Sequence, residues 1–179
     1  MENLERCRSG LTGLSRKQVC RKAPRVRIPL PPPHDSPVLG AFCLRYNRGM
    51  EDSIFTKIIN GDIPSYKIYE DDDVFAFLDI HPIVPGHTLV IPKKQVEFIW
   101  DLDDETYTKL TLAAKKIALH VRETLHVPYV GEKIVGIDVP HAHIHLIPFT
   151  SQDEYDRSAD DAAEPDHAAL AKMAESLSL

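Results

Sequence analysis

The pattern of apolar and polar positions divides the chain at Met50. Before that residue no helical or strand period persists, whereas folded-domain patterning begins directly after it. In SIFTKIIN (53–60) the apolar side chains recur at helical spacing, which predicts a short helix. Asp52 or Ser53 is the expected cap of that helix.

Two further helices are predicted toward the C-terminus. The segment 103–126 has a sustained apolar stripe, with Asp103 as its cap and Pro128 just after its end. A tail helix is expected at about 165–177, where apolar residues again follow the helical spacing.

Five short apolar runs predict strands, and the acidic turn at 71–73 joins the first two as a hairpin. Strands joined mostly by turns, together with one long helix, are typical of an α+β domain. We therefore expect an antiparallel sheet of about five strands, one long helix and short flanking helices. The five runs are YKIYED (66–71), DVFAFLDI (73–80), TLVIPK (88–93), EKIVGIDV (132–139) and HAHIHLIPF (141–149).

Charge separates the same two parts of the chain. Residues 1–49 contain 10 of the 21 Lys and Arg residues but 3 of the 27 Asp and Glu residues, which gives +7, whereas residues 50–179 carry −13. An acidic body argues against a nucleic-acid polymer as partner, because phosphate backbones are bound by basic surfaces. No apolar run reaches the roughly 18 residues of a membrane helix. With no convincing signal peptide either, we expect no membrane partner and a cytoplasmic location.

Three interpretations of residues 1–49 stay open. The segment is a disordered extension, or an Arg-rich and acid-poor transit peptide, or not part of the functional protein. We favour the third interpretation and take 50–179 as the domain, with its core at 53–149. All three cysteines precede residue 50, so no disulfide framework is predicted for the domain.

Three histidines stand at alternate positions of the last predicted strand. Alternate residues of a strand face the same side, so His141, His143 and His145 are expected to share one face. Burying them without partners is costly, and we therefore expect a polar or charged ligand. Imidazole binds zinc, copper and nickel, but consecutive positions of one strand wrap a tetrahedral ion poorly. A phosphate suits the row better, because one neutral ring can attack it while the neighbouring rings donate hydrogen bonds.

The histidine segment HAHIHLI (141–147) is a full match to the His-x-His-x-His-x-x pattern, with x hydrophobic, of the histidine triad (HIT) superfamily of nucleotidyl hydrolases and transferases. The upstream block SIFTKIINGDIPSYKIYEDDDVFAFLDIHPIVPGHTLVIPKK (53–94) resembles the N-terminal half of the Hint branch in the order and spacing of its elements. The resemblance covers roughly residues 53–149. Galactose-1-phosphate uridylyltransferase relatives carry Gln at the position of His145, so this histidine favours the hydrolase branches.

The resemblance implies a role for each matching residue. His143 would be the nucleophile that attacks the α-phosphorus of a nucleotide, while His141 and His145 would contact or orient the phosphate. His87 would lie near the phosphate, and Asp79 would accept the ribose hydroxyls. The base pocket would consist of Ile54, Phe55, Ile58, Phe77 and Ile80.

The chain departs from the family pattern near both motifs. Many bacterial relatives carry a zinc site that begins Cys-x-x-Cys, where this chain has Ser53 and Thr56, so we predict no structural zinc and no cofactor. Gln95 stands where a histidine is common after PKK. Asp138 stands where Hint-branch members tend to have serine. An acid would repel the phosphate there unless it turns away or binds the leaving amine, so Asp138 is a candidate leaving-group contact.

Three function classes stay open. The one we favour is a nucleotidyl hydrolase that cleaves purine nucleoside phosphoramidates or similar conjugates through a covalent nucleotidyl-histidine. The second is a dinucleoside polyphosphate hydrolase of the same superfamily, and the third is a non-catalytic nucleotide- or metal-binding module. The Hint branch also implies a two-fold homodimer, for which the long helix and the neighbouring strand offer an interface.

Overall fold

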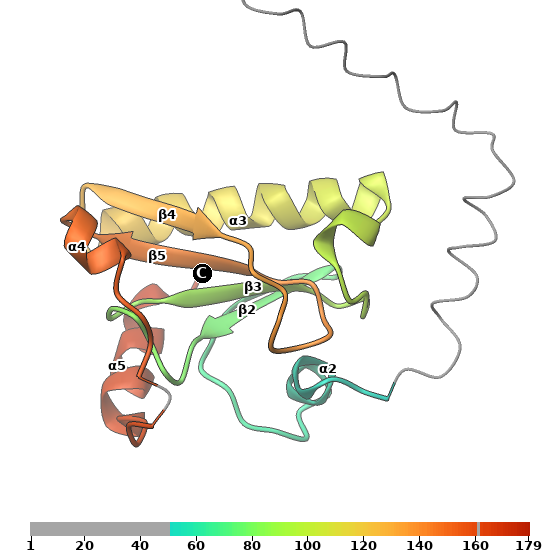
Figure 1. Ribbon diagram of the computed structural model, residues 1–179, viewed down its shortest axis with the longest axis horizontal. Helices are drawn as coiled ribbons and strands as arrows, with labels where there is room; N and C mark the ends of the chain where they lie inside the picture. The colour runs from blue at the N-terminus through green and yellow to red at the C-terminus, as the bar shows by residue number, and fades with distance from the viewer. Residues whose placement is uncertain (1–50, 161) are drawn as a thin grey trace, which may run out of the picture. The chain divides into compact units, whose positions relative to one another are not determined.

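Five strands form one antiparallel sheet, with the strand order β1-β2-β3-β5-β4 (Figure 1). The computed structural model describes residues 51–160 and 162–179, so the predictions for residues 1–49 lie outside the described residues. In chain order the elements are α2 (Ile54–Ile59), β1 (Lys67–Glu70), β2 (Val74–Leu78), β3 (Thr88–Pro92), a 3₁₀ turn (Ile99–Asp101), α3 (Asp104–Thr124), β4 (Tyr129–Lys133), β5 (Ile144–Phe149), α4 (Gln152–Tyr155) and α5 (His167–Leu177). The predicted α+β fold, with one long helix and short flanking helices, is confirmed.

The two faces of the sheet pack against different helices. Ala76 of β2 belongs to a buried cluster that includes side chains of α3 and α5. Its neighbours Phe75 and Phe77 point to the opposite face and pack against Phe55 of α2. Figure 1 accordingly shows α3 and α2 on opposite sides of the sheet. The α2 side is the one on which the candidate site is built.

Capping side chains start the helices where the sequence predicts. The Ser53 hydroxyl accepts a hydrogen bond from the Thr56 N–H at 3.1 Å, which caps α2. Asp103 accepts from the Thr106 N–H at 2.8 Å and caps α3. None of the helices within the described ranges combines the length and the hydropathy of a membrane span.

The two C-terminal strands differ from the predicted ones. β4 ends at Lys133 rather than continuing to residue 139, and β5 begins at Ile144 rather than at residue 141. Gly136 has φ +69°, a left-handed conformation that interrupts the strand. Pro92 and Pro140 have no N–H to donate to a ladder along this stretch. The predicted alternation nevertheless continues through the motif, although only His145 lies within the strand: Ala142, Ile144 and Leu146 belong to the cluster under α3 and α5, whereas the three histidine rings lie on the opposite face, where His141 and His143 contact Phe55 and His143 contacts His145.

Candidate active site

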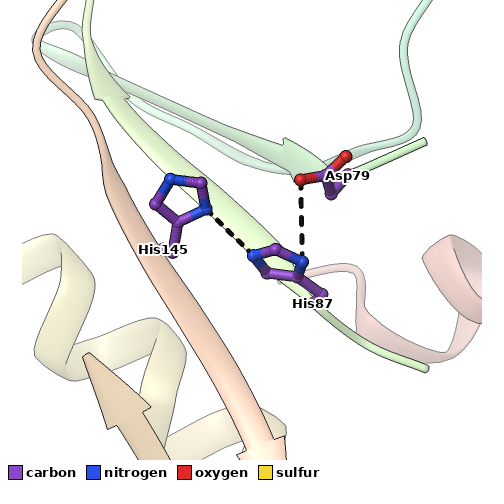
Figure 2. Close-up of side chains that lie close together, drawn as sticks. All are labelled: Asp79, His87 and His145. Atoms are coloured by element: carbon purple, nitrogen blue, oxygen red, sulfur yellow. Dashed lines mark hydrogen bonds and ion pairs between the residues drawn. The ribbon is translucent and has the colours of Figure 1, made fainter. Parts of the chain in front are cut away.

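The candidate site lies on the sheet face that carries the phenylalanine side chains. Phe77 pairs with Leu89, and Leu89 pairs with His145, so these side chains share that face. Asp79 comes directly after β2, and His87 directly before β3. Figure 2 shows the ring of His87 between the carboxylate of Asp79 and the ring of His145. The sheet register thus brings together residues that are up to 68 positions apart.

The buried His143 ring is held by a backbone carbonyl. Its Nδ1 lies 2.7 Å from the carbonyl oxygen of His141. Because a carbonyl can only accept, Nδ1 carries the proton of the neutral ring, and the lone pair remains on Nε2. The edge-to-face contact with Phe55, at 5.3 Å between ring centroids, fixes the ring plane. The contact with the carbonyl therefore defines Nε2 as the nitrogen of His143 that can act as a nucleophile.

His87 and His145 form a hydrogen-bonded pair beside it. The Ile83 N–H donates to His87 Nδ1 at 3.3 Å, so the proton of the neutral His87 ring is on Nε2. His87 Nε2–H then donates to His145 Nδ1 at 3.0 Å, which leaves the proton of His145 on its own Nε2. The His143 and His145 rings meet edge to face at 4.9 Å between centroids. A nitrogen lone pair and an N–H donor therefore stand on neighbouring rings.

Burial keeps the histidines of this pair neutral. It lowers the pKa of His87 to about 4, with a further contribution from the positive charge of Lys133. The pKa of His145 is also lowered to about 4, first by burial and then by repulsion from His143 and His87. At neutral pH both rings are uncharged hydrogen-bonding groups.

The carboxylate of Asp79 lies next to the His87 ring. Its Oδ1 accepts a hydrogen bond from the His81 N–H at 2.9 Å, which fixes its orientation. Its Oδ2 lies 3.6 Å from His87 Nδ1, where it would form an ion pair only with a protonated ring. The predicted ribose-binding residue is thus within the same group of side chains as two of the histidines.

His141 occupies a different environment from the other two histidines of the motif. Its side chain is fully buried, and both ring nitrogens have partners in the protein. Nε2–H donates to the Pro92 carbonyl at 2.8 Å, and Nδ1 accepts from the Ser53 hydroxyl at 2.9 Å. Burial lowers the pKa of His141, which favours this neutral form. The backbone carbonyl of His141, rather than its ring, contacts the nucleophilic histidine.

The residues at the expected zinc positions form a hydrogen-bond network. Thr56 donates to the side-chain oxygen of Gln95, and that oxygen also accepts from the Ser53 N–H at 3.0 Å. The hydroxyl of Thr56 lies 3.4 Å from His141 Nδ1. Two hydroxyls and an amide oxygen do not fit zinc, which takes thiolate, imidazole and carboxylate ligands. The donor set agrees with the sequence-based prediction, which stays a prediction.

The five residues of the predicted base pocket differ in burial. Phe55 and Phe77 meet edge to face at 5.6 Å between ring centroids, and Ile58 packs against their buried cluster. Ile54 and Ile80 are 49% and 46% exposed and lie outside that cluster. The structure therefore joins three of the five residues in one apolar wall beside the histidines.

Two charged residues complete the surroundings. Asp138 is exposed in the loop 134–143 and has no ion pair or side-chain hydrogen bond within the part of the chain that the structure describes. Lys133, at the end of β4, pairs in register with His145. Sequence reasoning missed Lys133, because its place beside the histidines depends on the register between β4 and β5. The hydrogen-bond network of Ser53, Thr56 and Gln95 was missed as well, because Gln95 is distant from the other two residues in the sequence.

Comparison with known proteins identifies the family of this arrangement. Residues 60–152 match the HIT domain family. The chain is 42% identical over 113 residues to an uncharacterized HIT-like protein of Borreliella burgdorferi, covering 59% of this chain and 81% of that protein. It is 42% identical over 96 residues to the adenosine 5'-monophosphoramidase HNT1 of Saccharomyces cerevisiae, covering 53% of this chain and 61% of that protein. The crystal structure of a Hit-like protein involved in cell-cycle regulation from Bartonella henselae superimposes with a TM-score of 0.61 at 34% identity, covering 70% of this chain and 94% of that one.

Proposed function

The chain belongs to the HIT domain family, and from this premise we propose that it hydrolyses nucleoside monophosphate conjugates, such as purine nucleoside phosphoramidates, at the α-phosphorus. One observation carries the proposal. The lone pair on His143 Nε2 stands beside the N–H donor of His145, on a face whose apolar wall suits a nucleobase. A nucleophile and a donor for phosphoryl oxygen are the groups that nucleotidyl transfer requires.

In the first step His143 Nε2 attacks phosphorus while the bond to the leaving group breaks. The leaving amine departs with the electron pair of that bond and takes up a proton from solvent, which the second step returns. Positive charge develops on the His143 ring, and the Nδ1–H bond to the His141 carbonyl strengthens with it. The Nε2–H of His145 donates to a phosphoryl oxygen, where negative charge accumulates. The product of this step is a nucleotidyl-histidine.

In the second step water attacks the same phosphorus. The N–P bond breaks, the electron pair returns to His143 Nε2, and the proton of the water is released. We assign Asp79 to the ribose hydroxyls and Phe55, Ile58 and Phe77 to the base, with Ile54 and Ile80 at the exposed rim. Asp138 stays the proposed contact for a leaving amine.

The proposal is tested with a panel of AMP and GMP conjugates. We expect AMP to be released from adenosine phosphoramidate by the wild type. His143→Ala should lose turnover and still bind AMP, because the base and ribose contacts remain. His120→Ala on α3, on the other face of the sheet, is the matched histidine control and should turn over normally. Near-normal turnover by His143→Ala would contradict the proposal.

The second candidate, a dinucleoside polyphosphate hydrolase, is separated in the same panel. A higher rate on diadenosine polyphosphate than on the phosphoramidate would favour it.

We also propose a homodimer that uses the outer face of α3 and the edge strand β4. Leu112 and Leu119, which lie two turns apart on the same side of α3, are 60% and 48% exposed. Tyr129 on β4 is 56% exposed. Exposed apolar side chains on a helix surface and on an edge strand are typical of a subunit interface. Analytical ultracentrifugation should give twice the chain mass, and Leu112→Lys with Leu119→Lys should give the monomer. A wild-type monomer at micromolar concentration would overturn this arrangement.

A further inference from the structure

One row of paired residues crosses the sheet on the face of the candidate site. It runs from Phe77 on β2 through Leu89 on β3 and His145 on β5 to Lys133 on β4. Paired residues of neighbouring antiparallel strands have their side chains on the same face. Neighbouring strands are about 4.8 Å apart, so each step of the row advances by about that distance.

The order of this row matches the order of groups in a nucleotide conjugate. The apolar wall around Phe77 lies at one end, and the proposed phosphate donor His145 lies two strands further on. A conjugate with its base at the wall and its phosphate at His145 has its leaving group directed away from the base. The next strand in that direction is β4, and the residue of β4 opposite His145 is Lys133.

The charge of Lys133 is not neutralised by an acidic partner. Lys67, Lys93, Lys94 and Lys109 are each within 3.0 Å of a carboxylate oxygen. Lys133 has no ion pair in residues 51–160 and 162–179, and its side chain is exposed. Its positive charge also contributes to the lowered pKa of His87 and of His145, which places the ammonium near both rings. An unpaired ammonium next to a phosphate-binding group is suited to a second anionic group of the ligand.

We propose that Lys133 is a specificity-determining residue that binds a negative charge on the leaving group, so that the preferred substrates are nucleoside monophosphate conjugates of amines that carry a carboxylate. The inference rests on the proposed function, because it assumes that the α-phosphate is placed at His143 and His145. It adds a substrate class to that function: conjugates of amino acids or similar amino carboxylates. Lys133 takes no part in bond breaking, and hydrolysis still proceeds by attack of His143 and departure of the amine.

The experiment uses two substrates that differ only in the charge. These are AMP joined through a P–N bond to β-alanine, which presents a carboxylate, and AMP joined to propylamine, which is its neutral counterpart. For the full-length wild type we expect a higher kcat/KM with the β-alanine conjugate. Lys133→Met keeps most of the side-chain length and removes the charge. It should lower kcat/KM for the β-alanine conjugate about three- to fivefold, the effect of one exposed charge pair, and leave the propylamine conjugate within about twofold.

Two further variants separate a local contact from a change of net charge. Lys172→Met removes the same charge from the exposed side of α5, whose apolar side packs on the other face of the sheet, and should leave the ratio of the two kcat/KM values unchanged. Lys133→Glu should reverse the preference, so that the propylamine conjugate becomes the better substrate. The selectivity of the wild type should also fall as salt is raised, because exposed charges are screened.

The failure of this inference is distinguishable from that of the proposed function. If the wild type hydrolyses both conjugates and Lys133→Met lowers both rates equally or neither, the inference is wrong and the proposed function stands. If the wild type hydrolyses neither conjugate and releases no AMP from adenosine phosphoramidate, the proposed function is wrong. Calorimetric binding of the two intact conjugates then tests Lys133 by itself: tighter binding of the β-alanine conjugate that Lys133→Met abolishes supports the contact, and equal binding overturns it.

Discussion

Lowering the pH from 7 to 5 should destabilise the folded chain through two buried histidines. The pKa of His87 and that of His145 are about 4 in the fold, against an ordinary value of 6.5. Between these values the unfolded chain binds more protons than the folded chain. The free energy of unfolding therefore is largest above pH 6.5 and falls as the pH is lowered toward 4.

The magnitude follows from the two pKa values. One histidine with a pKa of 6.5 in the unfolded chain and about 4 in the folded chain lowers the free energy of unfolding by about 2 kcal/mol between pH 7 and pH 5. Part of the His145 shift is repulsion from His87 and His143, so the two contributions are not independent. We expect about 3 kcal/mol for the pair, a large fraction of the stability of an ordinary domain.

Urea unfolding at the two pH values measures this difference directly. His87→Gln removes one of the two groups and should reduce the pH-dependent loss by about half. Asp103→Asn is the control, because its carboxyl has a pKa lowered by Lys94 and Thr106 and so contributes only to stability lost below the ordinary value of 3.8. That variant should be weakened equally at both pH values.

A stability loss below about 0.5 kcal/mol between pH 7 and pH 5 lies within the ordinary error of the urea extrapolation. Such a result would refute the reasoning. It would mean that His87 and His145 accept protons in the fold as readily as in water. NMR chemical shifts of the ring carbons, followed over the same pH range, test this directly. We expect both rings to keep the shifts of the neutral form at pH 5, and shifts of the protonated form would identify the cause of the refutation.

Three other outcomes check separate parts of the site. Ser53→Ala should lower the free energy of unfolding by about 1–3 kcal/mol, because it removes both the α2 cap and the buried hydrogen bond to His141, and Ser53→Thr should recover part of the loss in urea unfolding. An adenosine phosphorothioate conjugate of defined chirality should give product with retained configuration at phosphorus, since two inversions occur; an inverted product would exclude the covalent nucleotidyl-histidine. Asp138→Asn should slow release of an amine leaving group more than release of a phosphate leaving group, and equal effects in the two rate measurements would remove Asp138 from the site.

The sequence predicted the elements of the fold better than their ends. Short-range signals sufficed for α2 and α3, because the capping side chains Ser53 and Asp103 stand directly before the apolar pattern. The lengths of β4 and β5 depend on which backbone groups find partners across the sheet, and that information is distributed over distant segments. The pairing of Lys133 with His145 belongs to the same class of information and was missed for the same reason.

The departure of the histidine segment from the sheet is part of how the site works. In a regular ladder the carbonyl of His141 would accept a hydrogen bond from a neighbouring strand. Because β5 begins only at Ile144, this carbonyl is available to the ring of His143 two residues later, at 2.7 Å. The Pro92 carbonyl at the end of β3 similarly accepts from the His141 ring instead of a strand N–H. The alternating motif therefore places three rings on one face but gives them different roles: the backbone carbonyl of His141 holds the ring of His143, and that contact determines which nitrogen of His143 is left to attack.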